Sequence, residues 1–126
     1  MNTNNAYSKY KNNSVNFASK EQQLLMLLDG AVKFAKIGRQ ALTDSDYQRA
    51  NDNIKKTQSI FYELIATLDI NLSGEWGPKL ISVYKFIIDR LLNANIKKDV
   101  SIINEAIPLI EEVRDMWNQA YYASKR

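Results

Sequence analysis

The sequence predicts an all-α fold, an antiparallel up-and-down four-helix bundle that follows an extended N-terminal tail. Apolar residues recur every three or four positions along four segments, as they do in helices buried on one side. Short turns separate these segments, and helices joined by short turns pack antiparallel. The chain has 126 residues, 45% of them hydrophobic, and no cysteine, which suits one unstapled core. We expect a tail over residues 1–17 and a bundle over residues 18–126.

The first 17 residues read as a tail because they are rich in Asn, Ser and Lys and lack a sustained helical period. Tyr7, Tyr10 and Val15 are isolated apolar side chains within this polar stretch. We expect the tail to move freely unless its aromatic side chains dock on the bundle.

The first helix is expected to begin after Ser19, which has Gln22 three residues later as a capping-box partner, and to end near Leu42. Its expected buried stripe is Leu24, Leu27, Ala31, Phe34, Gly38 and Ala41. Glycine within a helix costs about 1 kcal/mol relative to alanine. Gly30 and Gly38 therefore suggest that another part of the chain approaches closely there.

The second helix follows the turn Thr43-Asp44-Ser45, and Ser45 with Gln48 repeats the capping-box pattern. Apolar residues at spacings of three and four predict a helix that ends at Asp69, before a loop that contains Gly74. Its expected buried stripe is Tyr47, Ala50, Ile54, Thr57, Phe61, Leu64 and Leu68.

Pro78 suits the first turn of a third helix, because its missing N–H would have no partner there. Asn95 is expected near the end of that helix, where it suits a C-terminal cap, and Asp99 is expected to cap the fourth helix. Pro108 predicts a kink in the fourth helix instead of a break. The expected stripes are Leu80, Tyr84, Ile87, Leu91 and Ala94, then Ile103, Ala106, Ile110, Val113, Trp117 and Ala120.

Three of the helices carry a second apolar row beside the first. The rows are Ile60 and Ile65, then Ile81, Ile88 and Leu92, and finally Ile102, Leu109 and Met116. For each residue alone, the edge of a wide core is the better interpretation. Taken together, the rows predict an exposed apolar groove that accepts an amphipathic helix or an extended apolar segment of another protein.

Composition excludes several other functions. The net charge of +3 is mild and the basic residues never form a stripe, so we expect no nucleic-acid binding. The apolar runs are too short to span a bilayer, and the first residues contain no secretion signal. We therefore expect a cytosolic protein with no membrane insertion.

The sequence predicts no catalytic residue, no metal site and no cofactor. It contains neither His nor Cys, which removes the usual general base, thiolate and zinc ligands, and the Glu-x-x-His sites of di-iron bundles. No glycine-rich phosphate loop is present. Asp44-Ser45-Asp46 resembles the start of a calcium loop, but its twelfth position is Lys55 instead of Glu.

Short motifs occur in a fixed order along nearly the whole chain. They are Ala6-Tyr7, Tyr10, Ala18-Ser19, Leu27-Leu28-Asp29-Gly30-Ala31-Val32-Lys33-Phe34, Lys56-Thr57-Gln58-Ser59-Ile60, Glu63-Leu64, Leu68-Asp69, Gly74-Glu75, Leu80, Tyr84, Arg90-Leu91, Ala94-Asn95, Asp99 and Trp117. This ordered set resembles the FliS-type flagellin export chaperones. The chain departs from the family's usual pattern at Phe17-Ala18-Ser19-Lys20 and at Val83-Tyr84-Lys85-Phe86, which affects the shape of any groove.

The resemblance implies a chaperone that holds the disordered C-terminal segment of flagellin, prevents premature polymerisation and helps deliver the subunit to the flagellar type III export gate. Whether a co-chaperone takes part is left open. By the same resemblance, Tyr7 and Tyr10 match tail aromatics that bear on partner binding. For the groove we select Ile60, Leu68, Tyr84, Ile88, Leu91 and Asn95, although Tyr84 and Leu91 also belong to the core stripe.

Two other hypotheses stand beside the chaperone. The bundle could be an oligomerisation or adaptor module with no role for flagellin, whose second apolar rows are buried between two copies. An enzyme that uses only carboxylates, lysine or tyrosine is a more distant third. The chaperone hypothesis expects a monomer or a weak homodimer with an accessible apolar surface.

Overall fold

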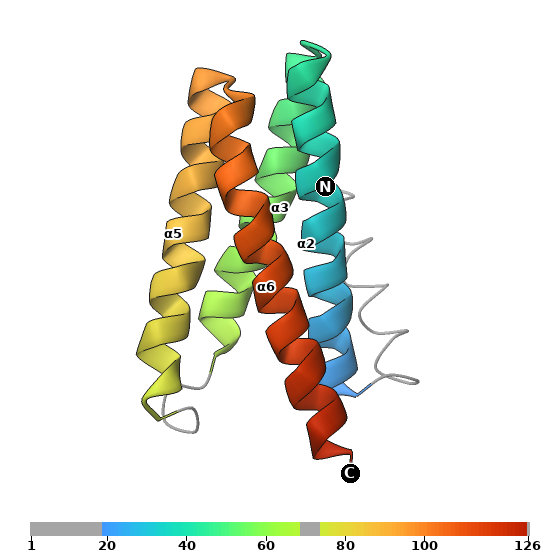
Figure 1. Ribbon diagram of the computed structural model, residues 1–126, viewed down its shortest axis with the longest axis vertical. Helices are drawn as coiled ribbons and strands as arrows, with labels where there is room; N and C mark the ends of the chain where they lie inside the picture. Colours follow the sequence, from blue (N-terminus) through green and yellow to red (C-terminus); the bar gives the residue numbers. More distant parts are fainter. Residues whose placement is uncertain (1–18, 69–73, 126) are drawn as a thin grey trace.

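Four long helices form the described part of this computed structural model, residues 19–68 and 74–125. They are α2 (Lys20–Thr43), α3 (Tyr47–Thr67), α5 (Trp76–Lys97) and α6 (Val100–Ser124). Each helix runs antiparallel to the next, and α2 and α5 each pack against both α3 and α6 (Figure 1). The predicted up-and-down four-helix bundle is confirmed. The expected tail over residues 1–17 lies outside the described residues.

Two helix starts follow the sequence prediction. At the start of α2, the Ser19 hydroxyl accepts a hydrogen bond from the Gln22 backbone N–H at 3.2 Å. The Gln22 side chain in return accepts one from the Ser19 N–H at 2.9 Å, which completes the capping box. Asp99 caps α6 by accepting a hydrogen bond from the Ser101 N–H at 2.8 Å.

The predicted cap of α3 is wrong by one residue. Ser45 has a left-handed backbone with φ of 57°, so it turns the chain and does not cap the helix. Asp46 is the N-cap and accepts a hydrogen bond from the Arg49 N–H at 3.3 Å. Gln48 instead donates to Asp52 at 3.1 Å. Because the turn needs one more residue than the pattern suggested, the capping role moves to the next polar side chain.

The third predicted helix extends farther at its C-terminal end than the sequence suggested. α5 begins at Trp76, which leaves Pro78 in the first turn as expected. It continues past Asn95 to Lys97, and Lys98 ends it with a left-handed backbone, φ 51°. Asn95 is therefore no C-terminal cap. α6 runs unbroken through Pro108, and the kink expected there stays a prediction.

One apolar core runs along the bundle axis. In α3, α5 and α6 most residues of the predicted stripes are buried, but Tyr47 and Ala120 are exposed. In α2 the buried face is rotated from the prediction, and Leu24, Leu27 and Phe34 lie only at its edge. The buried residues of α2 are Leu28, Ala31, Val32, Ala35, Gly38, Ala41 and Leu42. The buried face is rotated because α2 packs against both α3 and α6. Small residues of α2 such as Gly38 therefore lie close to side chains of both helices.

Gly38 confirms the expected close approach. A methyl group built on Gly38 would lie 3.0 Å from the Ile54 side chain of α3 and 3.7 Å from the Ile103 side chain of α6. Gly30 leaves more room, since its nearest neighbours would be Ile60 and Phe34 at 3.8 Å. Within the described ranges no helix is long and apolar enough to cross a membrane.

Candidate partner-binding surface

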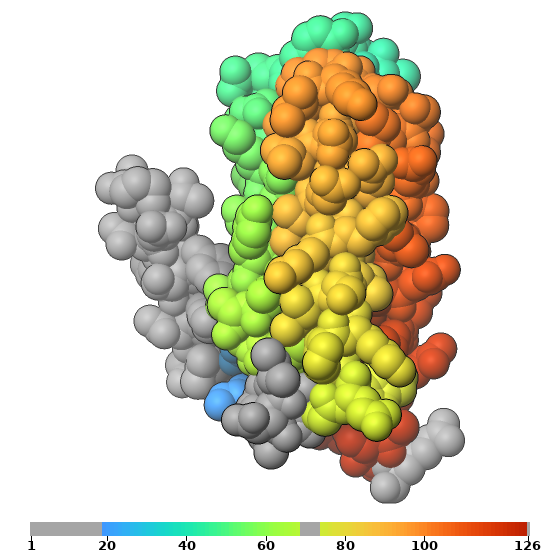
Figure 2. All heavy atoms as spheres, turned by 90° about the vertical axis from the view of Figure 1, so that its left-hand side faces the viewer, coloured from blue at the N-terminus to red at the C-terminus, as the bar shows by residue number. Residues whose placement is uncertain are grey.

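The surface over α5 carries exposed apolar side chains of α5 itself and of the neighbouring α3. α5 lies between α3 and α6, and Figure 2 shows this side of the molecule, with α5 in yellow and orange at its centre. Several large apolar side chains of α5 are exposed: Trp76, Val83, Phe86, Leu92 and Ile96. Ile96 is 70% and Phe86 51% exposed, far more than core packing requires. They flank α5 on two sides, so the helix has two apolar seams.

The seam between α3 and α5 carries an amide pair at one end. The Asn95 side-chain amide donates a hydrogen bond to the side-chain amide oxygen of Asn51 at 2.8 Å. The Lys98 ammonium donates to the Asn95 side chain at 2.6 Å and lies 5.8 Å from the centre of the Tyr47 ring. Farther along the seam the surface becomes apolar, with half-buried Ile65 and Ile81 and exposed Tyr62 and Leu92. Residues seven apart lie on the same side of a helix, and this spacing places these side chains along the seam.

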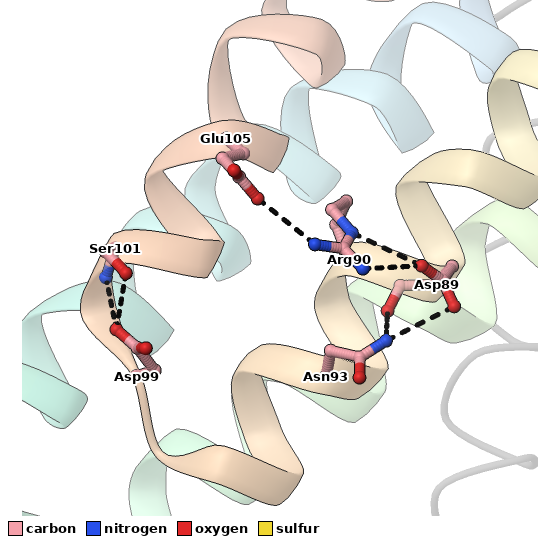
Figure 3. A network of polar contacts seen from close by, with 6 residues as sticks. All are labelled: Asp89, Arg90, Asn93, Asp99, Ser101 and Glu105. Carbon is pink, nitrogen blue, oxygen red and sulfur yellow. Dashed lines mark hydrogen bonds and ion pairs between the residues drawn. The ribbon is translucent and has the colours of Figure 1, made fainter.

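The seam between α5 and α6 is crossed by an ion pair. Arg90 of α5 donates to Glu105 of α6 at 3.3 Å and to its neighbour Asp89 at 2.9 Å (Figure 3). Asn93 donates to the other oxygen of Asp89 at 3.2 Å. The hydrogen bonds from Arg90 to Asp89 and Glu105 raise the pKa of its guanidinium. The network therefore holds two carboxylates around one guanidinium, next to the exposed apolar residues Val83 and Phe86.

The described residues selected from the sequence lie in four different places. Tyr84 and Leu91 lie in the core, where a partner of the closed bundle would not reach them, and Ile88 is 7% exposed. Asn95 lies in the α3/α5 seam, whereas Ile60 faces Gly30 of α2 across a different seam. Leu68 is half-buried at the end of α3. Tyr7 and Tyr10 lie outside the described residues.

Sequence reasoning missed part of the exposed apolar surface. Tyr62, Val83, Phe86 and Ile96 belong to neither predicted row, yet all are exposed. Their signal was available, since each is a large apolar residue on the side of its helix that the core does not use. The expected rows contributed Leu92, which is exposed, and Ile65 and Ile81, which are half-buried.

The described residues show little that would serve small-molecule chemistry. Among residues 19–68 and 74–125, no three carboxylates lie close enough together to hold a metal ion. A shallow hollow near the end of α6 is lined by Asn118, Gln119, Tyr122 and Ala123, none of them charged. The apolar seams of α5 are therefore the more informative surface.

The comparison with known proteins matches the whole described bundle. A family described as "Flagellar protein FliS" matches residues 3–124. The chain belongs to the FliS family of flagellar secretion chaperones. It is 35% identical over 122 residues to the flagellar secretion chaperone FliS of Bacillus subtilis (strain 168), covering 97% of this chain and 90% of that relative. It is 30% identical to the FliS of Campylobacter jejuni (serotype O:6, strain 81116), covering 96% and 94%.

The fold agrees with a solved structure described as a crystal structure of a flagellar chaperone from bacteria. The TM-score is 0.75, and the match covers 94% of this chain and 97% of that chain at 15% sequence identity. At that identity the likeness shows the shared bundle fold. The motif order that resembled FliS in the sequence therefore identified the family, and the fold it implied is present.

Proposed function

We propose that this FliS-family chain binds the disordered C-terminal segment of flagellin in the cytosol and holds it on the apolar seams of α5. It prevents premature polymerisation and aids delivery to the flagellar type III export gate. The observation that carries the proposal is the set of large apolar side chains left exposed along α5 in a member of a flagellar chaperone family.

The physical chemistry supports reversible holding. A segment that folds only during filament assembly must carry apolar faces, and exposed rows on a bundle can cover them. Ordering such a segment costs about 2–5 kcal/mol, which burial of apolar surface offsets. The segment keeps no stable fold of its own, so it can be released and unfolded for export.

Calorimetric titration with the C-terminal segment of the flagellin of the same organism tests this proposal. We expect saturable one-to-one binding with a negative heat-capacity change, because apolar surface becomes buried. No binding at tens of micromolar, about −6 kcal/mol, would remove the flagellin hypothesis.

Surface substitutions localise the interaction. Changing both Leu92 and Ile96 to Ser removes exposed apolar area from α5 without touching the core, so flagellin affinity should fall. Tyr122→Ser is the matched control, because Tyr122 is equally exposed but lies near the end of α6. Equal losses from both changes would place the binding surface elsewhere.

For the tail, we propose that Tyr7 and Tyr10 contribute to partner binding and that the tail occupies part of the apolar surface when no partner is bound. Tyr10→Ala should then weaken binding of flagellin or of the export gate while the helical circular dichroism stays unchanged. Unchanged affinity for both partners would contradict this role.

An oligomerisation module is the alternative that the same exposed residues would serve. Light scattering separates the two hypotheses. A monomer, or a homodimer that dissociates on dilution and binds flagellin, supports the chaperone. A stable dimer that buries the α5 surface and ignores flagellin supports the module instead.

A further inference from the structure

We propose that the α3/α5 seam binds an amphipathic helix whose apolar stripe is flanked by carboxylates on opposite sides, about one and a half turns apart. This inference rests on the proposed function, because it specifies the chemistry of the segment that the chaperone holds. It follows from how lysines and apolar side chains alternate across the seam.

Two cross-helix contacts fix the register of the seam. The amide pair joins Asn51 of α3 to Asn95 of α5, and the rings of Phe61 and Tyr84 lie 5.7 Å apart between their centres. Both contacts give the same antiparallel register. Position 55 of α3 is then level with positions 90 and 91 of α5, and position 62 is level with positions 83 and 84.

Each side of the seam presents one lysine and one large apolar residue. Lys55 and Tyr62 are seven residues apart on the outer side of α3, and Lys85 and Leu92 are seven apart on the outer side of α5. The register places Lys55 within two residues of the level of Leu92, and Tyr62 within two residues of the level of Lys85. Along the seam Lys55 and Lys85 are therefore five to six residues apart, about 8 Å at 1.5 Å per residue.

These lysines have no carboxylate of the described chain to neutralise them. Neither Lys55 nor Lys85 forms an ion pair with a described residue, and both are exposed. Of the nearby carboxylates, Asp52 accepts a hydrogen bond from Gln48, and Asp89 pairs with Arg90. Across the other seam of α5, by contrast, Arg90 already meets Glu105.

This pattern selects the occupant. An amphipathic helix laid along the seam would set its apolar stripe on Tyr62 and Leu92, with one carboxylate beside Lys55 and another, on its opposite flank, beside Lys85. A second copy of this chain would bring like charges together if it docked through the same seam. The seam is therefore suited to an acidic helix and not to self-association.

Two synthetic peptides test the inference without flagellin. They share one apolar stripe, and two flanking positions, five residues apart and therefore on opposite sides of the stripe, carry Glu in one peptide and Lys in the other. We expect the Glu peptide to bind on the order of tenfold more tightly at low salt, and the difference to shrink as salt screens the exposed lysines. Equal affinities would overturn the inference.

Charge reversal assigns the effect to the seam. Lys55→Glu with Lys85→Glu should reverse the preference between the two peptides. Lys20→Glu with Lys33→Glu makes the same change in net charge on α2 and should leave the preference intact. A preference that follows net charge alone, with both double variants behaving alike, also overturns the inference.

The flagellin titration is run separately on the same variants. If the wild type binds the Glu peptide selectively but ignores flagellin, the seam chemistry holds and the proposed client is wrong. If flagellin binds the wild type and the Lys55→Glu/Lys85→Glu variant equally well, and the peptides are not distinguished, the client is right and the seam assignment is wrong.

Discussion

The indole N–H of Trp117 in α6 donates a hydrogen bond to the hydroxyl of Tyr84 in α5 at 2.9 Å. The Tyr84 side chain is 1% exposed and its ring packs 5.7 Å from that of Phe61, centre to centre. A buried hydroxyl needs a partner, and the half-buried tryptophan supplies one. The pair therefore joins α5 to α6 beneath the partner-binding surface.

Tyr84→Phe should destabilise the bundle by about 1 kcal/mol, because it leaves the Trp117 N–H without its acceptor. Urea unfolding followed by circular dichroism measures the change. Tyr62→Phe is the control, since Tyr62 is exposed and its loss of a hydroxyl should leave the free energy of unfolding unchanged. A Tyr84→Phe protein as stable as the wild type would show that the hydrogen bond contributes nothing net.

The same residue predicts a loss of stability in alkali. Burial raises the pKa of Tyr84 above its ordinary value of 10.0, although the hydrogen bond from Trp117 opposes this. Between the unfolded and folded pKa values the unfolded chain binds fewer protons, so the free energy of unfolding declines as pH rises. The contribution of protonated Tyr84 to the free energy of unfolding is complete below pH 10.0 and is lost as pH rises through the folded pKa. Tyr84→Phe should flatten this decline in urea midpoints measured across that range.

The fold could be predicted because its signals are local and repeated. Ser19 with Gln22, Asp99, and the three-and-four spacing through Ile54, Phe61 and Leu91 each specify a helix end or a buried face. Ser45 was wrongly predicted to be the N-cap of α3, because capping depends on backbone angles as well as on residue type. Its φ of 57° is left-handed, whereas an N-cap residue is usually extended. The two residues by which α5 continues beyond Asn95 depend on Lys98, whose left-handed backbone no sequence pattern predicted.

The candidate surface could be predicted only in part, because a second apolar row can face a neighbouring helix or solvent. Ile88 is buried, although it shares its predicted row with exposed Leu92. The difference is one of a few tens of degrees around α5, which depends on how closely α3 packs. Phe86 lies outside both rows, on the side of α5 that the core does not use, so its exposure could have been predicted although no row included it.

Asp99 should make the folded protein less stable at acidic pH. Hydrogen bonds from the Ser101 side chain and backbone lower the pKa of the Asp99 carboxyl. The cap therefore stabilises α6 above the carboxyl's unfolded pKa, and this stabilisation is lost as pH falls through the lower folded pKa. Asp99→Ala should lower the melting temperature at neutral pH, whereas Asp99→Asn keeps a capping side chain and should lower it less. A melting temperature equally reduced by both variants would point to the charge instead of the cap.

Gly30 and Gly38 of α2 give a matched pair of substitutions with opposite expected signs. Alanine favours a helix over glycine by about 1 kcal/mol, so both changes gain from helix propensity. At Gly30 the new methyl group would make ordinary contacts at 3.8 Å with Ile60 and Phe34, and the gain should appear as higher stability. At Gly38 the methyl group would lie 3.0 Å from the Ile54 side chain, which is completely buried.

Overpacking of this kind costs about 1–3 kcal/mol, which equals or exceeds the gain from helix propensity. The free energy of unfolding of Gly38→Ala should therefore be no higher than that of the wild type.

A double-mutant cycle checks that the conflict is with Ile54. Ile54→Ala alone opens a cavity in the core and should cost about 2–5 kcal/mol. In the Gly38→Ala background the same change should cost less, because the added methyl group then occupies part of that space. Costs that simply add would mean that α2 moves away from α3 as a whole, in which case Gly38→Ala should also weaken the packing of Ile103 across the bundle.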